Sequence, residues 1–189
     1  EDTRRTGQLL KHLDISRPLV SCHQHNEARR SAEIVKRLQT GETVALVSDA
    51  GTPGISDPGE RVVREVLAAD LRVEPVPGAC ALVAGLTASG LPTKEFHFVG
   101  FLPNKSGQRR RRLEQLSVIS GTWIFYESPY RIDKLLVELA DIYPGSDVVI
   151  ARELTKLHEE MLRGHPQELI DRLEGRKLKG EIVVSVSRK

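Results

Sequence analysis

The residues with the clearest chemical meaning form a loop that follows an apolar run, Val44-Ala45-Leu46-Val47. The loop, residues 48–59, reads Ser-Asp-Ala-Gly-Thr-Pro-Gly-Ile-Ser-Asp-Pro-Gly. Glycine lets a ligand approach the main chain, and proline removes amide donors, so carbonyl oxygens predominate. Residues 41–60 contain acidic side chains and neither Lys nor Arg. The loop therefore disfavours a polyphosphate and favours a hydroxyl-rich or cationic ligand.

A second turn of the same kind, Pro77-Gly78-Ala79-Cys80-Ala81, leads into a predicted helix. Free amides at a helix N-terminus can hold a carboxylate or a carbonyl oxygen. Each turn also has a purely structural interpretation, as a tight connection or as small residues that allow close packing. A connection needs only about 2 to 6 residues, and the first loop spends roughly ten. Since both turns follow strands of neighbouring units, we expect them to converge on one cleft.

Basic residues are concentrated in one predicted helix, which contains the run Arg109-Arg110-Arg111-Arg112 after Lys105. Four successive arginines point in all directions around a helix, so some must face solvent or a partner. A solvated face is the usual explanation of such a run. Because the net charge of the chain is only +2, the run also creates a local field suited to a phosphate backbone.

Ionisable groups also follow other predicted strands. Phe125-Tyr126-Glu127 ends one strand, and the stretch Arg152-Glu153-Leu154-Thr155-Lys156 follows another. Both could contribute to a cleft, although surface salt bridges would explain the second equally well. His23-Gln24-His25 with Glu27 lacks a third partner at a metal-binding spacing, so substrate hydrogen bonding or a simple turn is favoured over a metal.

Composition limits the class of protein. The chain has 189 residues, of which 39% are hydrophobic, and it has two cysteines. These values predict a folded protein of a reducing cytoplasm, and no apolar run approaches the roughly 20 residues of a membrane span. No phosphate-binding Walker loop, dinucleotide-binding glycine pattern, serine-hydrolase elbow or metalloprotease helix occurs.

Hydrophobic periodicity predicts helices alternating with strands, which indicates an α/β fold with a largely parallel sheet. We expect a domain boundary between residues 91 and 92, after the glycine that closes the helix over 79–89. The expected strands are 18–22, 44–47, 72–76, 96–101, 122–126, 148–151 and 181–186. The expected helices cover the first segment, 26–41, 58–67, 79–89, a basic stretch from 106, a stretch after 129, and 166–173.

In several of these stretches, the chain resembles the tetrapyrrole methylase superfamily, and within it the ribosomal RNA methyltransferases. The loop at 48–59 carries the resemblance to the superfamily, and the stretches at His23, Phe125 and Arg152 narrow it. The matching stretches run in order: 1–4, 23–27, 47–59, 76–81, 100–103, 125–128 and 151–156.

The resemblance implies two α/β domains, 1–91 and 92–189, with S-adenosylmethionine in the cleft between them, and a homodimer without metal. It implies methylation of the 2'-hydroxyl of a cytidine in small-subunit (16S) ribosomal RNA. Methylation of a tetrapyrrole carbon, or RNA binding without catalysis, are the alternatives. The implied cofactor contacts are Asp49, Gly51, Thr52, Pro53, Ile55, Pro77, Gly78, Ala79, Cys80, Phe125 and Tyr126. From the residues themselves, Glu127, Glu153 and Lys156 are candidates for proton transfer, and Lys105, Arg109, Arg110, Arg111, Arg112 and Arg152 for RNA binding.

The chain departs from the family pattern in two places. Ala79 stands where the family usually has a second proline, which loosens that turn. The family's opening strand and its Gly-Asn-Leu loop would lie upstream of Glu1, so we expect the N-terminal domain to lack its first strand.

Overall fold

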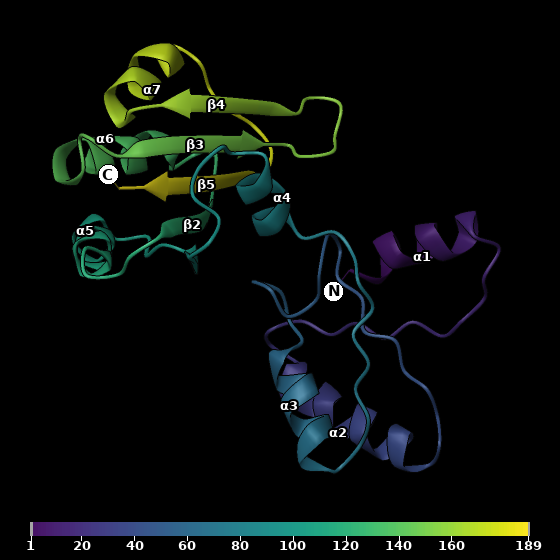
Figure 1. Ribbon diagram of the computed structural model, residues 1–189. Helices are drawn as coiled ribbons and strands as arrows, with labels where there is room; N and C mark the ends of the chain where they lie inside the picture. The colour runs from purple at the N-terminus through teal and green to yellow at the C-terminus, as the bar shows by residue number, and fades with distance from the viewer. Residues whose placement is uncertain (1, 189) are drawn as a thin grey trace. The chain divides into compact units, whose positions relative to one another are not determined.

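The computed structural model describes residues 2–188 and divides into two compact units, Glu1–Cys80 and Ala81–Lys189. The fold is α/β, as the sequence predicts, and the strands of the described residues lie in the second unit (Figure 1). The units divide at residues 80/81 because α4 (Ala81–Thr87) packs on the sheet of the second unit, through β5 and β2. The domain boundary predicted at 91/92 lies beyond this helix.

The second unit is built on a five-stranded sheet with the order β1-β2-β5-β3-β4. Only β1 and β2 pair in parallel, and β5 runs antiparallel to both β2 and β3. The prediction of a largely parallel sheet is therefore wrong for this unit, because the chain returns through a hairpin and a helix before β5 enters the centre. The strands are β1 (Phe96–Phe101), β2 (Thr122–Glu127), β3 (Asp147–Arg152), β4 (Glu160–Gly164) and β5 (Ile182–Ser187).

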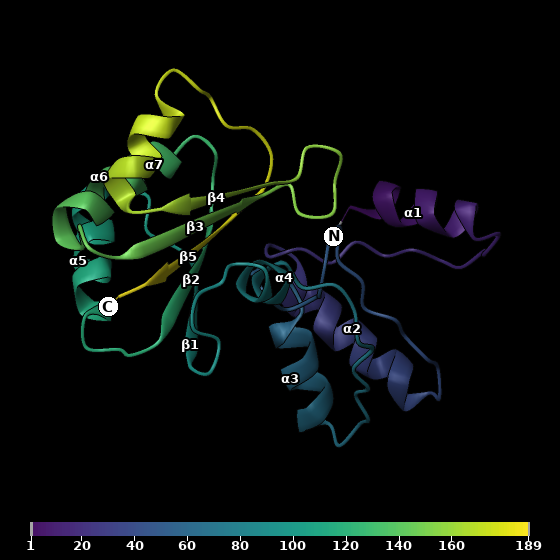
Figure 2. The same ribbon diagram turned by 45° about the horizontal axis from the view of Figure 1, so that its top comes forward.

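Helices cover both faces of this sheet, which explains why its central strands are apolar on both sides. One face packs against α5 (Ser106–Leu116), α6 (Ile132–Ile142) and α7 (Pro166–Leu173), around a core that includes Trp123 and Phe125. The opposite face receives α4, where Gly85 lies so close that a Cβ would come within 3.2 Å of Val183 Cγ1. Figure 2 shows these two helical layers on either side of the sheet.

The first unit contains α1 (Thr3–His12), α2 (Glu27–Gln39) and α3 (Glu60–Ala68). α2 and α3 lie side by side, and the buried residues Cys22, Val62 and Val66 form the centre of their small core. α3 begins at Glu60 with Gly59 as its N-cap, two residues later than the Asp57-Pro58 start that the sequence predicts. α1 buries no residue.

The strands predicted over 18–22, 44–47 and 72–76 are not formed in the described part of the first unit. A strand exists only where a neighbour completes its backbone hydrogen bonds, and no ladder joins these three segments. Several of their apolar side chains stay partly exposed, with Val20 at 49% and Val47 at 45%. In the second unit, by contrast, every predicted strand is confirmed within about two residues, the usual uncertainty of such boundaries.

Candidate functional site

The loop at 48–59 is wound tightly on its own backbone. The hydroxyl of Ser48 donates to the carbonyl oxygens of Ala50 and Gly51, and the Gly54 N–H donates to the Pro58 carbonyl at 3.2 Å. Gly51, Gly54 and Gly59 all have positive φ angles. Gly59 is the most constrained, because a Cβ there would lie 3.0 Å from Leu46 Cδ2 and 3.1 Å from Gly54 N. Other residues would be strained in these backbone conformations, which glycine adopts readily.

The two turns predicted to bind the cofactor lie against each other. The Thr52 hydroxyl donates to the Ala79 carbonyl oxygen at 2.8 Å, and a Cβ on Gly51 would lie 3.5 Å from the same oxygen. Gly51 and Ala79 are exposed, whereas Thr52, Pro53 and Ile55 are half-buried. Pro77 and Gly78 are also exposed, and the free thiol of Cys80 is half-buried. The first unit thus brings Gly51 and Thr52 of one turn into contact with Ala79 of the other.

Asp49 connects this region to the start of the chain. Its Oδ1 accepts a hydrogen bond from the Asp2 N–H at 2.8 Å. Asp2 in turn caps α1 by accepting from the Arg4 N–H, and its side-chain bonds to Arg4 lower the pKa of Asp2 to about 2. Two carboxylates therefore lie near the start of the chain, and the one of Asp2 forms an ion pair with Arg4.

Glu27, which the sequence offered only as a weak metal candidate, holds the end of the glycine loop. Its Oε1 accepts from the Gly59 N–H at 2.8 Å and from the Arg61 N–H at 3.2 Å. The carboxylate thus satisfies two donors at the N-terminus of α3, where negative charge is stabilising. Within residues 2–188, no three His, Cys, Asp or Glu side chains gather as a metal-binding group. This role of Glu27 was not predicted from the sequence. The available signal was that the N-cap of α3 is a glycine, which has no side chain to cap the helix and leaves its N–H groups for a carboxylate from another helix.

Replacing Glu27 with alanine is expected to loosen the glycine loop, because the backbone N–H groups of Gly59 and Arg61 lose a charged acceptor. Such bonds contribute about 1.5–3 kcal/mol. Hydrogen exchange should show faster exchange of the Gly59 and Arg61 amides. Glu33→Ala, which removes an exposed carboxylate from the same helix, is the control. Unchanged protection in Glu27→Ala would contradict this role.

His23 and Asn26 form a second fixed point beside α2. The Asn26 Oδ1 accepts from the His23 N–H at 2.8 Å, and its Nδ2 donates to the Ser21 carbonyl at 3.2 Å. These two bonds determine the orientation of the amide, so Nδ2 also donates to His23 Nε2 at 3.0 Å. The Asn26 side chain is therefore engaged with the loop before α2 instead of capping the helix.

In the second unit, Glu127 ends β2 with its side chain fully buried. Its Oε1 accepts from the Ser128 N–H at 2.6 Å and from Arg131 Nε at 2.7 Å, and Arg131 Nη2 lies 2.5 Å away. The other oxygen, Oε2, is buried and has no hydrogen-bond partner among the described residues. A buried carboxylate oxygen without a donor is costly, so it is the group most in need of one.

Glu153 and Lys156, the other two candidates for proton transfer, form an ion pair with each other. Lys156 Nζ lies 2.9 Å from Glu153 Oε1 and 2.9 Å from Glu181 Oε2, and these hydrogen bonds raise the pKa of Lys156. The Glu181 N–H donates to Glu153 at 2.8 Å, and this bond, with the one from Lys156, lowers the pKa of Glu153. A lysine held protonated in this way is a poor general base at neutral pH. The pair is consistent with the surface salt bridge that the sequence also allowed.

The four arginines of the run differ in burial and in ion pairing. Arg109 is 2% exposed, and its guanidinium forms two bonds with the buried Glu138, at 2.6 and 2.8 Å. We therefore correct its assignment: Arg109 is part of the core and cannot contact RNA. Arg110 is paired with Asp141. Arg111 is exposed and Arg112 is half-buried.

Lys105 and Arg152 complete the basic candidates. Lys105 is exposed at the N-cap of α5. Arg152 is half-buried, donates to the Lys179 carbonyl at 3.1 Å and lies 3.3 Å from Glu160 Oε2. Within residues 2–188, the basic candidates that form no ion pair are Lys105, Arg111 and Arg112.

The aromatic candidates of β2 have structural contacts. Phe125 is fully buried in the core, and the Tyr126 hydroxyl accepts a hydrogen bond from the Leu82 N–H of α4 at 3.2 Å.

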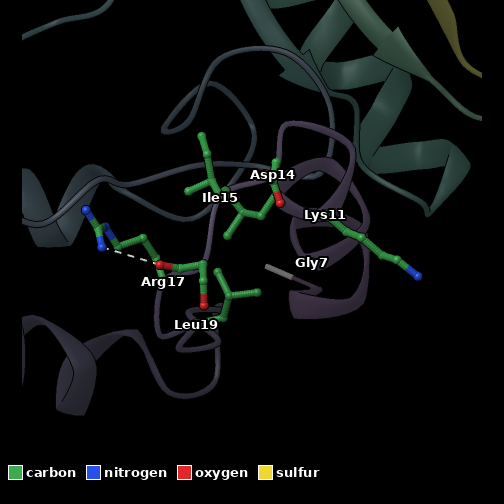
Figure 3. Close-up of a pocket in the computed structure, with 8 residues that line it drawn as sticks. Gly7, Lys11, Asp14, Ile15, Arg17 and Leu19 are labelled. Carbon is green, nitrogen blue, oxygen red and sulfur yellow. Dashed lines mark hydrogen bonds between the residues drawn. The ribbon is translucent and has the colours of Figure 1, made fainter.

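Two surface hollows lie apart from all candidate residues. One, of about 360 Å³, is formed by α1 and the segment after it, where Ile15 and Leu19 line the hollow and the Lys11 ammonium points away (Figure 3). The other, of about 430 Å³, lies between α6 and α7. We find no helix within residues 2–188 that combines the length and the apolar character required to cross a membrane.

Comparison with known proteins supports the resemblance. Residues 2–170 match the family described as Tetrapyrrole (Corrin/Porphyrin) Methylases. A relative from Pseudomonas aeruginosa, named ribosomal RNA small subunit methyltransferase I, is 46% identical over 190 residues, which cover 99% of this chain and 67% of the relative. A relative of the same name from Xylella fastidiosa is 49% identical and covers 98% of this chain and 69% of its own length. Across the first such relatives, the chain spans about two thirds of their length, from 64% to 69%.

Solved structures agree at the level of the fold. The uroporphyrin-III C-methyltransferase of Thermus thermophilus, complexed with S-adenosyl homocysteine, aligns with a TM-score of 0.57 at 18% identity, over 86% of this chain and 73% of that chain. At this identity the likeness concerns the fold alone. Together with the match over residues 2–170 and the relatives at nearly half identity, it leads to one conclusion. The chain belongs to the tetrapyrrole methylase family.

Proposed function

We propose that this protein transfers a methyl group from S-adenosylmethionine to small-subunit ribosomal RNA. The observation that carries the proposal is the 46–49% identity, along nearly the whole chain, with relatives named ribosomal RNA small subunit methyltransferase I. The more specific product is a cytidine methylated on its ribose 2'-oxygen. We further propose a cytoplasmic homodimer that uses no metal.

The turns joined by Thr52 and Ala79 fit the chemistry of the proposed cofactor. S-adenosylmethionine supplies a methyl group on a positively charged sulfur, which oxygens stabilise and arginines do not. The carbonyl-rich turns and Asp49 would hold it, with Gly51, Thr52, Pro53, Ile55 and residues 77–80 around it. The backbone of Phe125 and Tyr126 is the proposed contribution of the second unit to cofactor binding.

Glu127 is the best candidate to act on the hydroxyl that receives the methyl group. A neutral hydroxyl is a poor nucleophile, so an acceptor must orient it or take its proton. Glu127 has one oxygen without a donor within residues 2–188, whereas Glu153 and Lys156 bind each other. Because the Glu127 side chain is fully buried in this structure, the proposed role requires that RNA binding uncovers this oxygen. Most of the acceleration would come from holding the oxygen in line with the transferred group.

The RNA backbone would contact the basic residues of the second unit. Lys105, Arg111 and Arg112 are the strongest candidates because their charge is not neutralised by an ion pair among residues 2–188. Arg110 and Arg152 would have to exchange a protein partner for a phosphate. Such contacts orient the RNA and carry no sequence information.

The experiment that tests the proposal is methyl transfer from labelled S-adenosylmethionine to small ribosomal subunits, followed by mapping of the modified nucleotide. Label in a cytidine ribose supports the proposal in full, and label in a base contradicts the 2'-oxygen. Transfer to a tetrapyrrole instead would support the carbon-methylation alternative. RNA binding without cofactor binding would support a non-catalytic module.

Replacing Lys105, Arg111 and Arg112 together with serine is expected to weaken RNA binding and to flatten its dependence on salt. Each lost phosphate contact reduces the slope of log K against log salt by about 0.7 to 0.9. Titration of fluorescent RNA at several salt concentrations measures this slope, while calorimetry with S-adenosylhomocysteine should show unchanged cofactor affinity. An unchanged slope would remove these residues from the RNA site.

A further inference from the structure

Two arginines donate hydrogen bonds to one short segment of the second unit, residues 102–105 between β1 and α5. Arg109 Nη1 donates to the carbonyl oxygens of Asn104 at 3.2 Å and Pro103 at 3.4 Å. Arg131 Nη1 donates to the Leu102 carbonyl at 3.3 Å and to the Asn104 Oδ1. A connection of this length does not need two guanidinium groups to hold its backbone, which indicates that its position matters.

Each arginine is in turn fixed by a buried carboxylate, but the two carboxylates differ. Glu138 is saturated, because both of its oxygens bind Arg109 and its Oε1 also accepts from the Ser106 hydroxyl at 2.8 Å. Glu127 uses only Oε1 and leaves Oε2 buried without a partner within residues 2–188. Arg131, with 18% of its side chain exposed, binds Oε1 and therefore joins the carboxylate that carries the unpartnered Oε2 to the segment.

The segment carries one of the proposed RNA contacts, Lys105. Lys105 is its last residue, and α5 with Arg111 and Arg112 begins directly after it. Because Arg131 binds Glu127 with Nε and Nη2 and the segment with Nη1, one planar group sets the distance between the free oxygen and the basic residues. A guanidinium can make these bonds together since its donors form a rigid fork, which a lysine cannot imitate.

We propose that Arg131 is a positioning residue that fixes the unpartnered oxygen of Glu127 relative to the basic segment 102–105, so that binding of the RNA backbone aligns the target nucleotide with this acceptor. The inference rests on the proposed function. It assigns Arg131 no contact with the RNA. Its action is exerted through Glu127 on one side and through Leu102 and Asn104 on the other.

The test compares two arginine-to-lysine variants of the full chain in methyl transfer to small ribosomal subunits. Arg131→Lys is expected to lower kcat about tenfold and to raise the KM for subunits, because Glu127 and the segment both lose their link. Arg109→Lys, the matched variant, disturbs the same segment without touching Glu127, so it should raise KM and leave kcat within twofold. Thermal unfolding of both variants measures the structural loss that they share.

A third variant covers the case in which Arg131→Lys does not fold. Asn104→Ala removes an exposed side chain from the segment and keeps the Glu127–Arg131 pair, so it should raise KM several-fold with little change in kcat. The proposal is overturned if Arg131→Lys keeps the wild-type kcat, if Arg109→Lys lowers kcat equally, or if Asn104→Ala keeps the wild-type KM. Failure of the wild-type protein to methylate subunits would instead refute the proposed function.

Discussion

Glu127→Gln is expected to lower the rate of methyl transfer about 100-fold, at the lower end of what a positioned proton acceptor contributes. Glutamine keeps the shape of the side chain and one oxygen for Arg131 and the Ser128 N–H. At the position of Oε2 it presents an amide N–H₂, a donor in place of an acceptor. A hydroxyl oriented by Oε2 would then meet another donor, so the effect should fall on kcat more than on cofactor affinity.

Single-turnover transfer to small ribosomal subunits measures this loss, and calorimetry with S-adenosylhomocysteine checks the cofactor site. Glu174→Gln, which changes an exposed carboxylate after α7, serves as the control. A fall in thermal stability without a fall in rate would make Glu127 a structural residue only. The buried Oε2 would then be explained as the site of an internal water.

Arg109→Leu is expected to destabilise the second unit by about 3–5 kcal/mol, because it leaves the charge of Glu138 buried and unpaired. Both side chains are nearly inaccessible, at 2% and 5% exposure. Arg110→Leu, in the next position of the same helix, breaks a pair at the surface and should cost less than about 1 kcal/mol.

Urea unfolding followed by tryptophan fluorescence measures this difference within the second unit, since the chain has a single tryptophan, the buried Trp123 of β2. The double variant Arg109→Leu/Glu138→Leu should recover much of the loss, because two apolar side chains can replace a buried ion pair. Equal stability of the double variant and Arg109→Leu would show that the loss comes from packing rather than from an unpaired charge.

Most elements of the second unit could be predicted because they are buried by their neighbours, whereas β4 was not among the expected strands. The basic helix starts at Ser106 and α7 spans Pro166–Leu173, as predicted. The direction of β5 could not be predicted, since apolar alternation has no polarity along the chain. The strands of the first unit failed for a related reason: an extended apolar segment becomes a strand only when another segment pairs with it.

The candidate site shows the same division between local and long-range information. The two turns were expected to converge, and Thr52 and Ala79 are in contact, although the strands on which that expectation rested are not formed in the described residues. The roles of Glu27 and Arg109 could not be anticipated, since each depends on a partner about 30 positions away in the sequence. A run of identical arginines gives no indication of which one faces the core.

The place of β5 in the sheet has a consequence for how the protein is made. β2 and β3 each hydrogen-bond to β5 and not to each other, so two halves of the sheet are joined only through residues 182–187. During synthesis, those halves must wait until this strand has left the ribosome, and such distant pairing slows assembly. The nascent chain would meanwhile expose two apolar strand edges, which makes this interval the one in which a chaperone would matter most.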